Sequence, residues 1–119
     1  MYLIRTLSLA AHVPDDIDNI RIADVILDDR CPGFFRKYEE AYDCCINNKG
    51  DIFEDGYYNY AVIIRQGEGL YRNEEEVQWF HFQVIGEQYD RIASVSTCER
   101  PDILGVAHSP TNILPLVIG

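Results

Sequence analysis

The sequence of 119 residues predicts an α+β fold, in which one main helix packs on an antiparallel β-sheet. Residues 34–48 carry apolar side chains at the three- and four-residue spacing of a helix. The other patterned segments are rich in aromatic and β-branched residues and are separated by turn residues, as is typical of strands. The predicted order along a single domain, residues 1–119, is therefore β-β-α-β-β-β-(short α)-β.

The first two predicted strands are residues 2–10 and 20–27. The first is apolar apart from a few polar residues, which suits a strand at the centre of the sheet or at an interface. Residues 12–19, HVPDDIDN, are predicted to form the loop between them, because Pro breaks a strand while Asp and Asn favour turns. A loop this short predicts antiparallel pairing, and the sequence DDRCPG is expected to end the second strand.

The main helix is predicted over residues 34–48, with Pro32 at its entrance and Asn47, Asn48 and Gly50 at its end. Charged residues occupy the side opposite the apolar positions, so we expect the aromatic side chains to belong to the core. These apolar positions are Phe34, Phe35, Tyr38, Ala41, Tyr42, Cys45 and Ile46.

Residues 50–84 hold the only Trp and three of the five Phe, and the rest of the chain is predicted to be arranged around them. Residues 57–66 and 77–84 are predicted to form a hairpin. The connection QGEGLYRNEEE contains glycines and three consecutive Glu, which predict a solvated loop. Alternation leaves aromatic residues on both faces, so one face should contact the core and the other a further element, subunit or ligand.

Residues 91–97 are predicted to add a third strand to this hairpin, and residues 100–104 a short helix or turn. Residues 112–118 form a last apolar strand or tail, which Pro115 restricts to a sheet edge or a subunit boundary. One helix covers only part of one sheet face. The aromatic residues of the other face therefore predict a homo-oligomer, with two-fold pairing as the default.

The formal charge of −10 opposes binding to polymeric nucleic acid, which is held by an excess of basic residues. Eight of the ten basic residues are nevertheless Arg, which suits a small phosphorylated ligand in a local Arg pocket, although a bias in codon usage or strain is the favoured explanation of the excess. No apolar run reaches the roughly 18–20 residues of a membrane span, and the first residues do not resemble a signal peptide. We therefore expect a cytoplasmic protein that does not contact membranes.

The sequence lacks a nucleophile elbow, a phosphate loop, a dinucleotide motif and a metal triad, so no catalytic residue, cofactor or metal ligand is predicted. The four Cys lack zinc spacing and are expected to be reduced and buried rather than to act as a nucleophile beside His12, His81 or His108. The Asp cluster in residues 12–19 lacks the Gly and Glu of a calcium loop. An enzyme is therefore disfavoured.

The predicted ligand site combines aromatic rings with Arg side chains, because a base that stacks on a ring and phosphates held by guanidinium groups are the usual means of holding a nucleotide. Core packing of either ring remains an equal alternative. The residues predicted to bind the ligand are Trp79, Phe82, Arg91, Arg65, Arg72 and Arg100.

Three segments, GDIFEDGYYNYAVIIRQGEGLY, EVQWFHF and NILPLVIG, resemble a group of small phage and bacterial proteins that includes the first type of Thoeris anti-defence protein. The resemblance covers roughly residues 31–82 and the tail, and its motifs are more specific for the fold than for the ligand. At Ile64 and Arg65 the group more often has acidic residues, so this chain departs from the pattern there. The resemblance places Asn112, in the tail, near a subunit interface and adds it to the predicted site.

This resemblance implies a phage or prophage protein that acts in the host bacterial cytoplasm as a sponge. Members of the family sequester the cyclic ADP-ribose isomer of Thoeris defence, and some hold cyclic trinucleotides of CBASS defence, without cleaving them. They form dimers that can assemble into hexamers as trimers of dimers. The alternative that the residues leave open is an acidic protein-binding inhibitor or immunity protein, whose carboxylates cap a basic site on a nuclease or toxin. The charge of −10 favours this alternative, and the excess of Arg over Lys does not.

Overall fold

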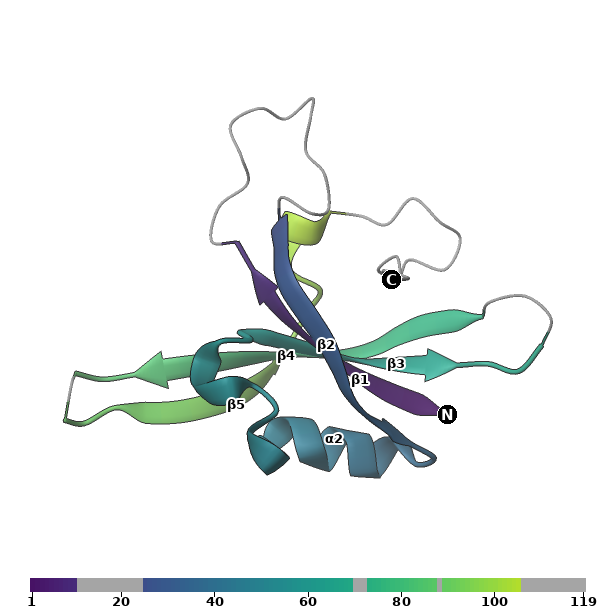
Figure 1. Ribbon diagram of the computed structural model, residues 1–119, viewed down its shortest axis with the longest axis horizontal. Coiled ribbons are helices and arrows are strands. Elements are labelled where there is room, and N and C mark those ends of the chain that lie inside the picture. Colours follow the sequence, from purple (N-terminus) through teal and green to yellow (C-terminus); the bar gives the residue numbers. More distant parts are fainter. Residues whose placement is uncertain (11–24, 70–72, 88, 106–119) are drawn as a thin grey trace.

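The computed structural model describes residues 1–10, 25–69, 73–87 and 89–105 (Figure 1). It contains an antiparallel five-stranded sheet of order β2-β1-β3-β4-β5, with one main helix packed on it, so the predicted α+β class is confirmed. The strands are β1 (Tyr2–Leu9), β2 (Ile26–Phe35), β3 (Tyr60–Gln66), β4 (Glu74–Ile85) and β5 (Ile92–Cys98). The helix is α2 (Tyr38–Ile46), and short 3-10 turns are η2 (Lys49–Asp51), η3 (Glu54–Gly56) and η4 (Asp102–Leu104).

Strands β1 and β3 form the centre of the sheet, and both are buried on both faces. Ile4 pairs with Ile63 and points to one face, whereas Leu3 pairs with Ile64 and points to the other, as the two-residue period of a strand requires. All four side chains are buried. The central position expected for the first strand is therefore confirmed.

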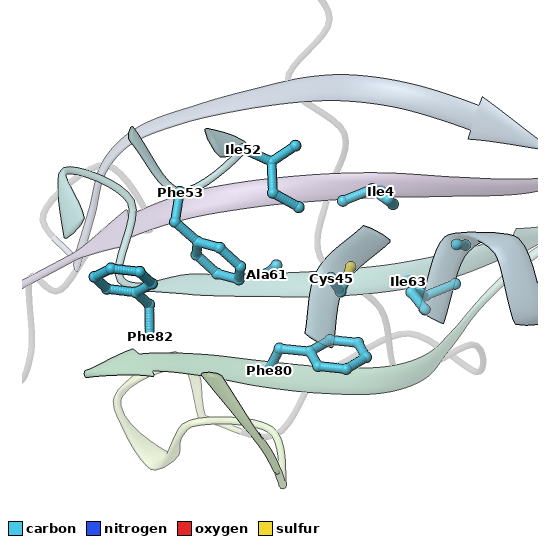
Figure 2. Packing of buried hydrophobic residues seen from close by; sticks show 9 residues of the cluster. Ile4, Cys45, Ile52, Phe53, Ala61, Ile63, Phe80 and Phe82 are labelled. Atoms are coloured by element: carbon cyan, nitrogen blue, oxygen red, sulfur yellow. The ribbon is translucent and has the colours of Figure 1, made fainter. Parts of the chain in front are cut away.

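The first of two apolar clusters lies on the side of the sheet that α2 covers, and we call it the helix-side core (Figure 2). Phe80 is fully buried here and meets the ring of Tyr42 edge-on, with 5.3 Å between the ring centroids. Phe53, from the segment between η2 and η3, stacks on Phe82. The cluster consists of Ile4, Ala41, Cys45, Ile52, Phe53, Ala61, Ile63, Phe80 and Phe82.

The second cluster lies on the opposite face, and we call it the far-side core. It consists of Leu3, Leu7, Leu9, Val25, Ile26, Val62, Ile64 and Trp79. Ile103 and Leu104 pack against it from η4. We expected this face to remain open for another subunit, but its large apolar side chains are buried within the chain itself. The far-side face therefore offers no uncovered aromatic surface that would support an oligomer. The homo-oligomer itself remains a prediction.

The segment DDRCPG does not end the second strand, and the helix does not begin at Phe34. Strand β2 continues to Phe35, and α2 begins only at Tyr38. The pairing shifts between Ile4 and Thr6 of β1, so that β2 contributes one extra residue there. Pro32 lies at this bulge in an edge strand. A Pro is tolerated there, because an edge strand pairs on one side only and the missing backbone N–H need not break a hydrogen bond between strands.

The bulge lies beside a buried ion pair. Arg5 of β1 is 3% exposed, and its Nε donates to Oδ2 of Asp29 in β2 at 2.7 Å. This pairing explains how an Arg occupies the face of the far-side core, since a buried guanidinium requires a carboxylate or equivalent acceptors.

The three consecutive Glu belong to β4 and not to a solvated loop. Glu74 and Glu75 pair with Gln66 and Arg65 of β3, so the hairpin ladder extends through the acidic run. The side chain of Glu74 is buried, and that of Glu76 is 8% exposed. Strand β3 in turn starts at Tyr60, three residues later than expected, because residues 54–56 form a 3-10 turn that leads into Tyr57.

The remaining expectations divide into those that the structure confirms and those that lie outside it. Antiparallel pairing of β1 with β2 and the meander β3-β4-β5 are confirmed, and η4 provides the short helix near Leu104. The expected loop 12–19, most of the expected strand 20–27 and the tail 112–118 lie outside the described residues. Within the described part of the chain, no helix is long and apolar enough to cross a membrane.

Replacement of Phe80 by Ala should lower the free energy of unfolding by about 3–5 kcal/mol, because a fully buried ring is removed from beneath α2. Denaturant unfolding followed by circular dichroism measures this change. The control is Tyr89→Ala, which removes a ring that is 93% exposed and should change stability by less than about 0.5 kcal/mol. Equal effects of the two substitutions would contradict the described core.

Candidate functional site

An open groove of about 430 Å³ lies where the end of β5 runs beside the start of β4. It contains two of the predicted ligand-binding residues, Trp79 and Arg100. Its lining consists of Glu75, Glu76, Val77, Gln78, Trp79, Cys98, Glu99 and Arg100. Because it brings together a ring, a guanidinium and carboxylates, we treat it as the candidate functional site.

The carboxylate of Glu76 joins the two predicted residues. Its Oε1 accepts a hydrogen bond from Nε1 of Trp79 at 3.0 Å, and its Oε2 accepts one from Nη1 of Arg100 at 2.5 Å. Nε of Arg100 also donates to the carbonyl oxygen of Gly105 at 3.0 Å. Nε1 of Trp79 is thus satisfied within the protein, and the guanidinium of Arg100 is engaged through Nε and Nη1.

A β-bulge at Val77 makes this contact possible. In a regular strand, residues three apart point to opposite faces. Here Ile63 pairs with Gln78 but Ile64 pairs with Glu76, so Val77 is an extra residue in β4. The bulge turns Glu76 to the same face as Trp79, which is the face of the far-side core. No sequence pattern signals this contact of Glu76, because a bulge cannot be recognised from alternation alone.

The other predicted site residues that the structure describes do not join this groove. Phe82 is buried in the helix-side core, where its ring lies 5.3 Å from that of Phe53, so it packs on the face opposite to Trp79. Arg65 is exposed and pairs with Glu75, with 3.1 Å from Nε to Oε1. Arg91 is exposed just before β5, at the end of that strand remote from the groove. Arg72 and Asn112 lie outside the described residues.

Acidic side chains dominate the charge of the groove. Among the described residues, Glu75, Glu76 and Glu99 line it together with one basic residue, Arg100. Glu76 balances the charge of Arg100, and Glu75 pairs with Arg65, which does not line the groove. The side chains of Glu76 and Arg100 are 8% and 17% exposed, so solvent screens this pair less than a surface pair. A cationic group is therefore favoured at the rim, and an anion would have to compete with Glu76 for Arg100.

The described residues offer little for nucleophilic or metal chemistry. All four Cys are free, as expected, and burial raises the pKa of the Cys45 thiol well above its ordinary value. Cys31 is exposed rather than buried, which differs from our expectation. The ring of His81 stacks on Tyr60, and desolvation lowers the pKa of His81. Within the described ranges no group of three or more His, Cys, Asp or Glu side chains could hold a metal ion.

Comparison of the chain with protein-family models, with curated proteins and with solved structures finds no match. The geometry and charge of the groove are therefore the basis for assigning a function.

Replacement of Glu76 by Gln should lower the free energy of unfolding by about 1–3 kcal/mol, because the shielded guanidinium of Arg100 loses its carboxylate. Denaturant titration gives the stability, and the fluorescence of Trp79, the only Trp in the chain, should change in the folded baseline.

The matched control is Glu75→Gln, which removes the neighbouring carboxylate from an ion pair whose side chains are about half exposed. We expect less than about 0.5 kcal/mol from this change, since exposed ion pairs contribute little. If both variants lose the same stability, Glu76 is not a structural link between Trp79 and Arg100.

Proposed function

We propose that this protein acts by binding, and that its acidic groove receives a basic side chain of a partner protein. This is the inhibitor or immunity function that the sequence left open. The observation that carries the proposal is the charge of the groove, where three carboxylates stand against one Arg among the described lining residues. Glu76 pairs with that Arg and Glu75 pairs with Arg65, whereas Glu99 forms no ion pair within the described residues.

The exposed part of the groove determines which group it suits. Glu75 is more than half exposed, and Val77 beside it is 38% exposed, so a carboxylate and an apolar surface lie together at the rim. An Arg or Lys side chain fits such a surface, since its hydrocarbon stem packs on apolar atoms while its charge meets the carboxylate. The net charge of −10 would accelerate the approach of a basic partner.

A cyclic nucleotide sponge is the second proposal, in line with the resemblance to Thoeris anti-defence proteins. The adjacency of Trp79 and Arg100 favours it, because a ring and a guanidinium meet in one groove. The Glu76 carboxylate weighs against it, because it already balances the charge of Arg100 and a phosphate would have to compete with it for the guanidinium. The groove therefore supports the basic partner better than the nucleotide.

Replacement of Glu75 by Lys should weaken the binding of an arginine-rich peptide about tenfold, because a rim carboxylate becomes a like charge. Titration of the intrinsic fluorescence of Trp79, or calorimetry where the fluorescence does not change, measures the affinity. The control is Glu40→Lys, an equal change of charge at an exposed position in the first turn of α2, and it should weaken binding less than about threefold.

Equal weakening by the two variants would mean that the peptide responds only to net charge and that the groove is not its site. The same titration with cyclic ADP-ribose isomers and cyclic tri-adenylate tests the second proposal. Saturable binding of a nucleotide that is recovered intact, without binding of the peptide, would replace the first proposal by the second.

A further inference from the structure

The two edges of the sheet differ in how they are protected against another strand. The β2 edge carries Asp28, Asp29 and Arg30, followed by Pro32 at a bulge. Charges, Pro and bulges are the usual means by which proteins prevent edge-to-edge pairing. The β5 edge, with the sequence IASVSTC, has none of these features. Within the described residues, one edge of the sheet is thus protected and the other is not.

Strand β5 is exposed over most of its length. Ile92 is 67% exposed, and Ser94, Ser96 and Thr97 are also exposed. Among the described residues, β4 is the only strand that pairs with β5. Figure 1 shows the far ends of β4 and β5 extending as a hairpin to one side of α2. The exposure of the β5 side chains leaves this edge open to a second strand within the described part of the chain.

The charges at the two ends of β5 are complementary under a two-fold axis. Arg91 precedes the strand and Glu99 follows it, and the seven residues between them are uncharged. If two copies pair antiparallel with Val95 opposite Val95, then Arg91 of each copy lies opposite Glu99 of the other. Both side chains are exposed, and within the described part of the chain neither forms a hydrogen bond or an ion pair.

The same charges disfavour the neighbouring registers. A slip by one residue in one direction brings Glu99 opposite Asp90, and a slip in the other direction brings Arg91 opposite Arg100. Like charges directly opposite each other destabilise a strand pair, whereas opposite charges stabilise it. A partner of another sequence would have no reason to match this pattern, so the charges select a second copy of this chain.

We propose that β5 pairs with β5 of a second copy in the register centred on Val95, which makes one continuous sheet from two chains. Ile92 of each copy then lies opposite Cys98 of the other, and Ser94 lies opposite Ser96. The pairing covers the exposed Ile92 and satisfies the outward-facing backbone groups of both edges. It brings Arg91 of one copy to Glu99 at the rim of the other copy's groove, so three predicted site residues gather there only in the dimer.

Sedimentation equilibrium of the unmodified protein tests the proposal, and we expect a monomer–dimer equilibrium. Arg91→Glu and Glu99→Arg should each raise the dimer Kd about tenfold, because each creates two like-charge pairs per dimer. The double variant Arg91→Glu with Glu99→Arg should restore the dimer. A protein that stays monomeric at all concentrations, or a double variant no better than the single variants, would overturn the proposal.

A second pair of variants distinguishes an interface at the β5 edge from an interface elsewhere on the surface. Ser94→Lys combined with Ser96→Lys should abolish the dimer, since Lys residues then face one another along the interface. Leu27→Lys with Phe34→Lys adds the same charge at exposed positions of the β2 edge and should leave the dimer intact. Circular dichroism verifies that each variant is folded. The opposite outcome would place the interface on β2 and contradict the proposal. The measurement uses the protein alone, so it is independent of the ligand of the groove.

Discussion

The burial of β1 and β3 on both faces is the constraint on which the rest of the structure depends. A strand that is covered above and below must have a core on each side, and the chain supplies one with α2 and another around Trp79. Thr6 and Ile63 show how complete this burial is, since neither exposes any surface. The middle of the sheet therefore has no face for a ligand or partner. Surfaces for recognition are left at the edges and ends of the strands.

The candidate groove follows from this constraint. It lies where β4 begins and β5 ends, at the margin of the far-side core. The bulge at Val77 rotates Glu76 onto the face of Trp79, and the carboxylate then ties β4 to Arg100 beyond the end of β5. Because of this one extra residue, part of the acidic run provides this link and another part lies at the acidic rim of the groove. This link also balances the charge of the guanidinium that a phosphate would need.

The sequence predicted those features that depend on local periodicity. The class, the central first strand and the β3-β4-β5 meander all follow from two- or three-to-four-residue patterns that the structure retains. The start of the helix was misplaced because Phe34 and Phe35 happen to continue its apolar spacing, and because Pro32 signals a helix start as readily as an edge strand. Glu74 and Glu76 were placed in solvent because their burial depends on partners distant in the sequence.

The candidate site was less predictable than the fold, for a related reason. Trp79 and Phe82 were grouped by composition, but the three-residue separation in a strand places them in different cores. Of the predicted site residues that the structure describes, only Trp79 and Arg100 meet in the groove. The residue that joins them, Glu76, gives no signal in the sequence because bulges interrupt alternation. The unprotected edge of β5 became evident only when the sheet order placed β2 and β5 at the two margins.

Hydrogen exchange measured at several protein concentrations tests the central claim most directly, namely that recognition takes place at an open sheet edge. The account predicts that the amides of β5 exchange more slowly as the concentration rises, while exchange in the protected β2 edge and in the central strands does not change. Exchange in β5 that is independent of concentration, over a range in which sedimentation detects association, would contradict it.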